Sequence, residues 1–169
     1  MKKNILFALP LAFMLASCGG AEKPADSTPV DSSATATPEV SATPGEVQMT
    51  IKITGNSMTD MAYEPGSASV KAGDKVTVTL INENKAAGML HNWVLVNLGS
   101  GQEVATAAIA AGPDKEYIPE NANVLAYSKM LNPEETTTFE FTAPTAGSYN
   151  YICTYPGHFP KMVGKLVVQ

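Results

Sequence analysis

The feature that most limits the fold of this chain is a series of short segments in which apolar and polar residues alternate. The first runs from Val47 to Ile53 and ends at a Gly-Asn pair. A period of two places successive side chains on opposite faces of a β-strand. Further strands are predicted at residues 76–80, 91–97, 124–127, 136–142, 148–154 and 163–168. Short strands separated by turn residues predict an all-β fold, a Greek-key β-sandwich.

One stretch interrupts this pattern. Residues 103–111 are rich in alanine, and Ala, Glu and Gln favour helix. Asp114 is expected to cap a second short helical turn. Residues 98–123 are therefore predicted to form a short helical flap inserted between two strands. The preceding strand, 91–97, is more continuously apolar and is predicted to be covered on both faces.

The N-terminus has the organisation of an export signal. Two lysines precede an apolar stretch at residues 5–15 that is too short to span a bilayer. Residues 15–18 (LASC) resemble the lipobox of bacterial lipoproteins, whose signal peptide is cut before a cysteine that carries the lipid. The resemblance implies a lipoprotein signal peptide at residues 1–17 and lipidation of Cys18. The protein would then be exported and anchored to a bacterial membrane, facing the periplasm or the cell exterior. The alternative is an ordinary signal peptide with a chance cysteine near its end.

Residues 18–46 are predicted to be a disordered linker. They are rich in Ser, Thr, Ala and Pro and contain almost no large apolar residue. Such a segment buries too little surface to offset the entropy lost on ordering, and its prolines favour extended conformations. The linker is expected to hold one folded domain, residues 47–169, away from the membrane.

The charge of the chain excludes one class of partner. It contains no arginine and has a formal net charge of −5. Removal of residues 1–17 leaves 9 lysines against 16 acidic residues, a charge of −7. Nucleic-acid binding needs clustered cations that displace counterions, so no nucleic-acid partner is expected.

The cysteines point to a metal. The chain has two, and if Cys18 carries a lipid, Cys153 has no partner within the chain. An unpaired thiol is unusual in an oxidising compartment, where it is reactive, bridged to another chain or protected by a metal. Cys153 begins a C-x4-H-x3-M motif that continues to His158 and Met162, and His91 is the one other histidine. Thiolate, imidazole and thioether donors together suit copper.

Two segments carry a family resemblance. Residues 91–95 (HNWVL) and 153–158 (CTYPGH) resemble the signature segments of azurins, and auracyanins are similar. The likeness extends over residues 47–169. It implies a cupredoxin-like fold and one type 1 copper ion, bound by Cys153, His91, His158 and, as weak axial ligand, Met162. It also implies that Asn92 ties the two ligand loops together and that Thr154 acts beside the thiolate.

The chain departs from the azurin pattern in two places. The positions of the azurin N-terminal disulfide correspond to Met49 and Gly73, so that bridge is absent. Azurins have a glycine before the first histidine, whose carbonyl can approach copper, and this chain has Leu90. A weak contact from the Leu90 backbone is therefore left open.

The resemblance also implies an apolar patch around an exposed edge of His158, at which redox protein donors and acceptors dock. Apolar patches of this kind mark docking surfaces, although their residues can also be plain turn residues. The patch is predicted to contain Met89, Tyr155, Pro156, Gly157, Phe159 and Pro160.

The function predicted from these features is one-electron transfer outside the cytoplasm by a monomeric domain, and no enzyme activity is expected. A copper carrier or chaperone is the alternative. A catalytic copper protein would need a second copper centre with further histidines, which the chain lacks. A structural zinc site could use the same Cys and His ligands.

Overall fold

The structure, a computed structural model, describes residues 44–169. The predicted signal peptide, Cys18 and most of the predicted linker lie outside the described residues. Between residues 44 and 169, no helix combines the length and the apolar character that crossing a membrane requires.

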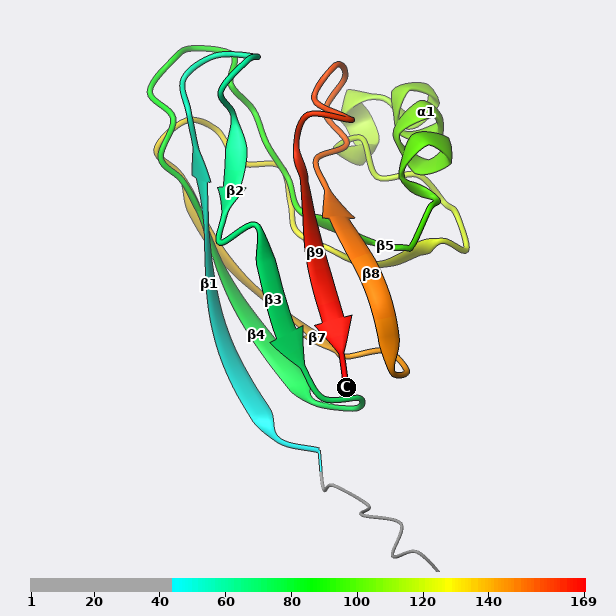
Figure 1. The fold of residues 1–169 in the computed structure, drawn as a ribbon. Coiled ribbons are helices and arrows are strands. Elements are labelled where there is room, and N and C mark those ends of the chain that lie inside the picture. The colour runs from blue at the N-terminus through cyan, green and yellow to red at the C-terminus, as the bar shows by residue number, and fades with distance from the viewer. Residues whose placement is uncertain (1–43) are drawn as a thin grey trace, which may run out of the picture. The chain divides into compact units, whose positions relative to one another are not determined.

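Two β-sheets form the described domain (Figure 1). Across the first sheet the order is β2 (Ala62–Glu64), β1 (Glu46–Thr54), β4 (Lys75–Asn82) and β7 (Thr136–Thr142). Across the second it is β3 (Ser67–Val70), β9 (Val163–Val168), β8 (Gly147–Ile152), β5 (Val94–Asn97) and β6 (Val124–Tyr127). Five of the connections between successive strands pass from one sheet to the other. The predicted all-β sandwich is confirmed.

Pairing between sequence-distant strands fixes the sandwich. β1 pairs in parallel with β4, and β3 pairs in parallel with β9. The remaining strand pairs are antiparallel, including β8 with β9, the strands that flank the Cys153 loop. Because β8 pairs with β5 as well, the segment that follows His91 is hydrogen-bonded beside the strand that leads into Cys153.

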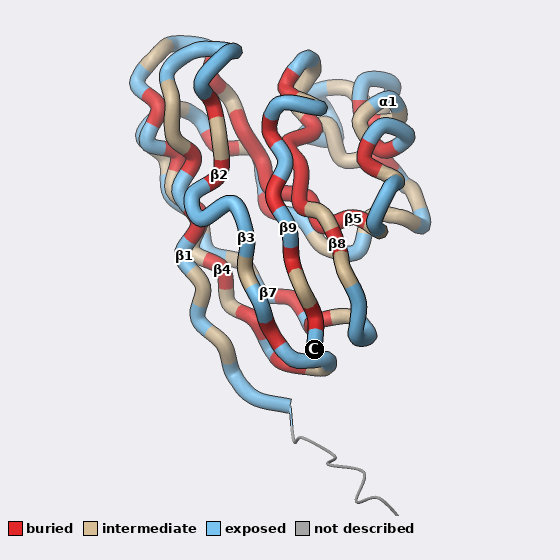
Figure 2. The backbone as a smooth tube through the Cα atoms, in the orientation of Figure 1, coloured by how far each residue is buried: buried red, intermediate tan, exposed pale blue. Residues whose placement is uncertain are grey.

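The core between the sheets is centred on Trp93. Its side chain is fully buried, and its ring centroid lies 5.2 Å from that of Phe139 and 5.5 Å from those of Phe141 and Tyr151. Buried residues alternate with exposed or half-buried ones along β4 and β9, and along β7 half-buried or buried residues alternate with exposed ones (Figure 2). The period-two pattern therefore marks the strand faces that meet in this core.

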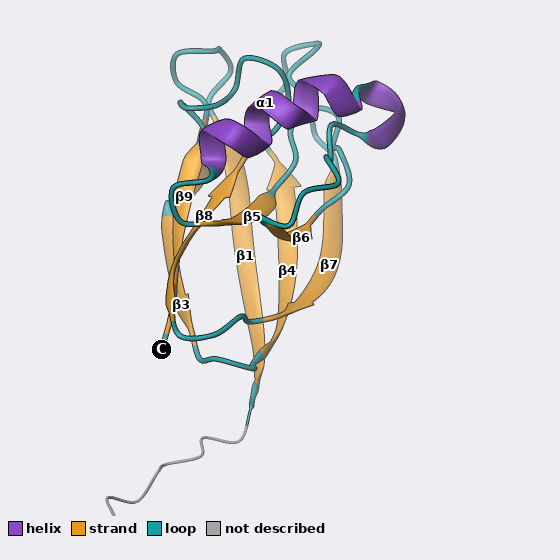
Figure 3. Ribbon diagram, turned by 90° about the vertical axis from the view of Figure 1, so that its right-hand side faces the viewer, coloured by secondary structure: helices purple, strands orange, loops and turns teal. Residues whose placement is uncertain are grey.

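The flap begins with helix α1 (Gly101–Ala111), followed by a single 3-10 turn, η1 (Pro113–Lys115). Figure 3 shows α1 crossing one end of the sandwich above β5 and β6. Val104 of α1 joins a small cluster with Val94, Val96 and Ile152, whereas Leu95 packs in the core between the sheets. Strand β5 is thus covered on both faces, as predicted.

Two local predictions were wrong, and two short strands were missed. The strand predicted from residue 91 begins at Val94. Just before it, Trp93 N–H donates to the Ser128 hydroxyl at 2.9 Å and not to a backbone carbonyl of a neighbouring strand. Strands β2 and β3 were not predicted, since three or four residues carry little periodicity. Asp114 lies inside η1 and caps nothing, because Gly112 occupies the N-cap position.

Candidate metal centre

His91 stands at the entrance to β5 and is fully buried. Its backbone forms an isolated β-bridge with Leu131, in which His91 N–H donates to Leu131 O at 3.1 Å and Leu131 N–H donates to His91 O at 2.7 Å. Both backbone polar groups of His91 are therefore paired within the domain. The bridge holds the imidazole at the end of the sandwich that also carries the β8–β9 loop.

The β8–β9 loop closes on itself. Cys153 N–H donates to Met162 O at 3.2 Å, and Met162 N–H donates to His158 O at 2.9 Å. His158 N–H donates to Tyr155 O at 3.1 Å, across a turn in which Gly157 has φ +83°. That left-handed conformation suits glycine, which lacks a Cβ. These bonds bring Cys153, His158 and Met162 together in a preformed loop.

Three donor atoms converge between the two segments. Cys153 Sγ lies 3.4 Å from His158 Nδ1 and 3.8 Å from His91 Nδ1, and the two Nδ1 atoms are 3.1 Å apart. All three side chains are at most 1% exposed. The predicted Cys and His ligands, 62 residues apart in sequence, are thus brought together.

The donor atoms are spaced for a single ion. A trigonal ion with metal–nitrogen distances of ~2.0 Å and a metal–sulfur distance of ~2.3 Å, as zinc has, separates its donors by about 3.5–3.7 Å. The three observed distances scatter around these values. Two imidazoles and one thiol, with a thioether in the same loop, are the donor set that copper favours. The residues therefore fit copper.

Burial controls the protonation of this site without metal. It raises the pKa of the Cys153 thiol to about 12, against a smaller opposing effect of the Asn92 and Tyr155 backbone. Burial lowers the pKa of His91 to about 3, and repulsion from His158 adds to the shift. Burial alone lowers the pKa of His158 to about 4. At neutral pH both imidazoles are thus neutral with a lone pair available, and cation binding must release the thiol proton.

Asn92 links the two segments. Its Nδ2 donates to Thr154 Oγ1 at 2.8 Å, and its Oδ1 accepts from Thr154 N–H at 2.9 Å. Its backbone oxygen accepts from the Tyr63 hydroxyl at 2.5 Å. Both residues predicted to support the site, Asn92 and Thr154, are therefore bonded to each other beside the ligands.

Met162 and Leu90 are the two residues predicted to contact copper weakly. Met162 is fully buried and packs in the same apolar core as Cys153. Leu90 is half-buried, and its N–H donates to Gly88 O at 3.0 Å. Ligation by the Met162 sulfur and a contact from the Leu90 carbonyl both stay predictions.

The docking patch differs from its prediction. His158 is 1% exposed, so its ring has no free edge; the Tyr155 ring covers it with a centroid distance of 4.9 Å. Met89 is buried, whereas Tyr155, Pro156 and Phe159 are half-buried and Gly157 and Pro160 are exposed. The sequence motif does not fix ring coverage, because coverage depends on how the loop folds over the imidazole.

Two elements distant in sequence extend this surface. Met58 is 49% exposed, and its Cε would lie 3.4 Å from a Cβ added at Gly157. Helix α1 packs on the loop so closely that a Cβ at Gly101 would lie 2.7 Å from Phe159 Cε2. Sequence reasoning missed both contacts, which depend on the tertiary arrangement.

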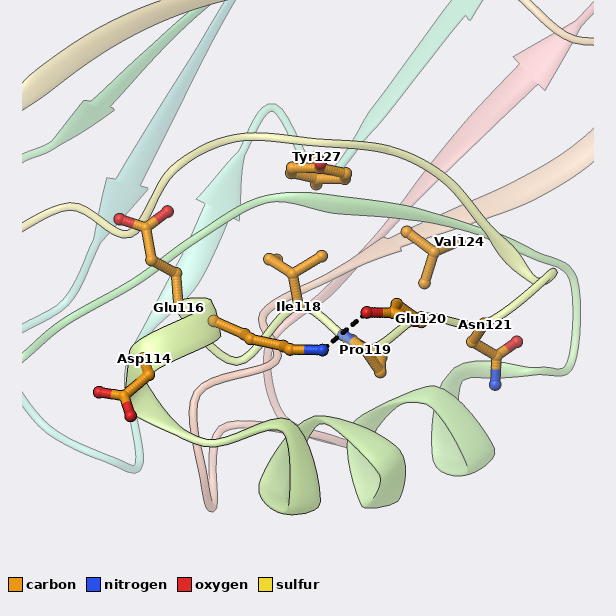
Figure 4. Close-up of a pocket in the computed structure, with 9 residues that line it drawn as sticks. Asp114, Glu116, Ile118, Pro119, Glu120, Asn121, Val124 and Tyr127 are labelled. Carbon is orange, nitrogen blue, oxygen red and sulfur yellow. Dashed lines mark hydrogen bonds and ion pairs between the residues drawn. The ribbon is translucent and has the colours of Figure 1, made fainter.

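A separate surface pocket of about 560 Å³ lies under the flap, lined by residues from η1 to Tyr127. Lys115 and Glu120, which both line it, form an ion pair at 2.7 Å. Figure 4 shows Glu120 beside Pro119 and Asn121, with the Tyr127 ring on the opposite side of Ile118. The three clustered ligand candidates do not line this pocket. Tyr117, which does not line the pocket, packs its ring edge-on against Tyr155 at 5.4 Å.

Asn82 and Asn84, buried at the end of β4, were also missed. Asn82 Nδ2 donates to Met89 O at 3.1 Å and to Asn132 O at 2.9 Å. Asn84 Nδ2 lies 3.4 Å from His91 Nε2. Two asparagines before a predicted ligand resemble an ordinary turn, so their sequence signal is weak.

Comparisons with known proteins agree with this geometry. Residues 47–169 match the model of the family described as copper binding proteins, plastocyanin/azurin family. Auracyanin-A from Chloroflexus aurantiacus is 38% identical over 162 residues, covering 94% of this chain and 91% of that protein. Azurin from Pseudomonas fluorescens biotype C is 32% identical over 128 residues, covering 70% of this chain and 98% of that protein.

Solved structures give the same result. The structure of auracyanin A, titled a "blue" copper protein, matches with a TM-score of 0.66 and 41% identity, over 74% of this chain and 100% of that chain. An azurin iso-2 from Methylomonas sp. strain J matches with a TM-score of 0.64 and 29% identity, over 73% of this chain and 98% of that chain. The chain belongs to the plastocyanin/azurin family of copper-binding proteins.

Proposed function

We propose that the domain at residues 47–169 is a one-electron carrier with one type 1 copper ion bound by His91, Cys153 and His158, and by Met162 as axial ligand. The observation that carries this proposal is the convergence of one thiol sulfur and two imidazole nitrogens, buried and 3.1–3.8 Å apart. Copper, when bound there, supplies a one-electron Cu(I)/Cu(II) couple.

The residues of the chain hold the site rigid. His91 is fixed by its bridge to Leu131, the β8–β9 loop by its own backbone bonds, and the two segments by the Asn92–Thr154 pair. A preformed ligand set changes little between oxidation states, so little reorganisation opposes electron transfer.

Partners would dock over the β8–β9 loop, with Tyr155 as the contact that covers His158. The surface proposed is Tyr155, Pro156, Gly157, Phe159 and Pro160, extended by Met58 and without the buried Met89. Its exposed apolar groups support docking of a redox protein. Electron self-exchange brings two such surfaces together, so Tyr155→Lys should lower the self-exchange rate. An unchanged rate would contradict docking at this surface.

The N-terminal segment supports a location outside the cytoplasm, with lipid on Cys18 anchoring the protein to a membrane and residues 18–46 acting as the tether. Mass spectrometry of protein extracted from its own membranes tests this, since unlipidated Cys18 would contradict the anchor. The domain is proposed to be monomeric.

A copper carrier is the alternative function, and the burial of the ligand side chains weighs against it. Ligands that are at most 1% exposed release an ion slowly, whereas a carrier must pass its ion to a partner. The test compares two rates in the copper-loaded protein: electron self-exchange, expected to be fast, and copper exchange with a chelator, expected to be slow. The reverse order would favour the carrier. Cys153→Ser, which removes the thiolate, should abolish the blue absorption band.

A further inference from the structure

Met58 is the one exposed methionine in the part of the chain that the structure describes. Its side chain is 49% exposed, whereas the other methionines between residues 44 and 169 are buried or half-buried. These others are Met49, Met61, Met89, Met130 and Met162. Because a thioether must meet an oxidant in solvent to react with it, oxidation of the folded protein should begin at Met58.

A tight turn fixes the backbone that carries Met58. Ser57 N–H donates to Asp60 Oδ1 at 2.7 Å, and Asp60 N–H donates to Ser57 O at 3.3 Å. Gly55, with φ +82°, approaches this turn so closely that an added Cβ would overlap the Asp60 carbonyl. Met58 therefore leaves a turn that is closed on both sides of it, which limits where its side chain can reach.

The sulfur of Met58 lies beside the ligand loop. The methyl carbon bonded to that sulfur would lie 3.4 Å from a Cβ added at Gly157. Gly157 is exposed and directly precedes His158. Met58 thus forms one flank of the surface proposed for partner docking, next to a proposed copper ligand.

Oxidation would make this flank polar. The sulfur lone pair attacks one oxygen of hydrogen peroxide, the O–O bond breaks as the S–O bond forms, and the second oxygen leaves as water. Sulfur loses two electrons and the peroxide gains them, so no other group of the protein takes part. A docked apolar surface would leave the new sulfoxide oxygen unpaired, and burial of an unpaired polar group is unfavourable.

We propose that Met58 is a peroxide-sensitive modification site, and that its conversion to the sulfoxide slows electron transfer by opposing docking over the β8–β9 loop. The effect on electron transfer rests on the docking surface proposed above, whereas the site of oxidation rests on exposure alone. The four proposed ligand side chains are at most 1% exposed, so peroxide reaches Met58 first. The modified protein keeps its copper and its colour but exchanges electrons slowly.

Peptide mass spectrometry tests the site of oxidation. The copper-loaded full chain, in its Cu(II) form, is exposed to hydrogen peroxide and sampled over time. One oxygen should enter at Met58 before any enters at the other described methionines, and the blue band should persist. Oxidation that begins at a buried methionine, or that proceeds equally at all of them, overturns the proposal.

Electron self-exchange, measured after catalase has removed the peroxide, tests the effect. The rate should fall about tenfold, because a polar group left unpaired at an interface costs roughly that factor. Met58→Gln places an amide oxygen near the position of the sulfoxide oxygen and should lower the rate similarly without peroxide. Met58→Leu keeps an apolar side chain, so its rate should equal that of the untreated protein and should not respond to peroxide.

A methionine placed elsewhere is the matched control. Ala146 is exposed in the turn that precedes β8, at the opposite end of that strand from Cys153. In the double variant Met58→Leu, Ala146→Met, peroxide should add an oxygen at position 146 and leave the self-exchange rate unchanged. An equal loss of rate in this variant would mean that oxidation slows exchange without acting at the docking surface, against the proposal.

Tyr155→Lys separates this proposal from the docking surface on which it rests. If Tyr155→Lys lowers the self-exchange rate and Met58→Gln does not, docking at the loop stands and the role given to Met58 is wrong. If neither substitution lowers the rate, both are wrong. The electron-carrier function is independent of both outcomes, because the blue band and the reversible couple test it.

Discussion

At the scale of single residues, Met162 differs from the other proposed ligands in what its sulfur contributes. A thioether is neutral at all pH values and is a soft donor, so it favours Cu(I) without a proton to lose. The backbone of Met162 is already bonded at both ends, to Cys153 and His158. Loss of its sulfur should therefore leave the loop intact and change mainly the energy of the bound ion.

Met162→Leu should keep the blue colour of the copper-loaded protein and shift its reduction potential upward. Leu replaces Met with little change of volume, at a cost below about 1.5 kcal/mol in the free energy of unfolding. Voltammetry and the visible spectrum measure both effects. Met61→Leu, at another fully buried methionine, is the control. If Met162→Leu changes neither potential nor spectrum, the axial assignment is wrong.

The residues that sequence reasoning found and missed differ in kind. Cys153, His158 and Met162 are held by a short loop, so their spacing alone indicated a shared site. Asn84 and Met58 reach the site through folding, and Tyr155 covers His158 through a loop conformation that no motif encodes.

At the scale of elements, the hairpin of β8 and β9 carries the ligand loop, and its pairing depends on one glycine. Tyr151 on β8 lies directly opposite Gly164 on β9. The Tyr151 ring is fully buried against Trp93 at 5.5 Å, and its hydroxyl donates to Pro65 O at 2.8 Å. The ring thus occupies the space above Gly164 and is held at both ends.

Gly164→Ala should lower the free energy of unfolding by about 2–3 kcal/mol, because the added methyl group overlaps the fixed Tyr151 ring. Urea unfolding measures the change. Gly147→Ala on β8 is the matched control: its Cβ would lie 3.6 Å from the nearest atom, an ordinary contact, and the effect should stay within about 0.5 kcal/mol. Equal effects of the two substitutions would show that the ring is free to move.

Element prediction succeeded where burial alternates from residue to residue. In β4 buried residues alternate mainly with half-buried ones, and in β7 half-buried or buried residues alternate with exposed ones. It failed at β2 and β3, which are three and four residues long. It also placed the start of β5 too early. A hydrophobic run does not reveal that the backbone N–H of Trp93 donates to the Ser128 hydroxyl and not to a neighbouring strand.

At the scale of the whole domain, the site places a thiol and two imidazoles in an apolar core, and stability should depend on pH. The unfolded histidines protonate near pH 6.5, whereas His91 and His158 in the fold have pKa values of about 3 and 4. The unfolded state therefore binds more protons below pH 6.5, and stability falls as pH falls. The Cys153 pKa of about 12, raised from 9, acts in the opposite sense above pH 9.

The metal-free domain should lose about 1 kcal/mol per histidine between pH 6.5 and 5.5. Its unfolding midpoint in urea, followed by tryptophan fluorescence over this range, measures the loss. His91→Gln, which removes one of the two titrations, should lose about half as much. A midpoint that does not change between pH 7 and 5.5 would show that the histidines are not buried in the neutral form.

The visible spectrum of the copper-loaded domain, recorded with its voltammogram, tests the central claim most directly. A copper ion bound by the Cys153 thiolate between His91 and His158 predicts one copper per chain, an intense blue absorption band and a reversible one-electron couple. A colourless Cu(II) complex, or a protein that takes up no copper, would contradict the account.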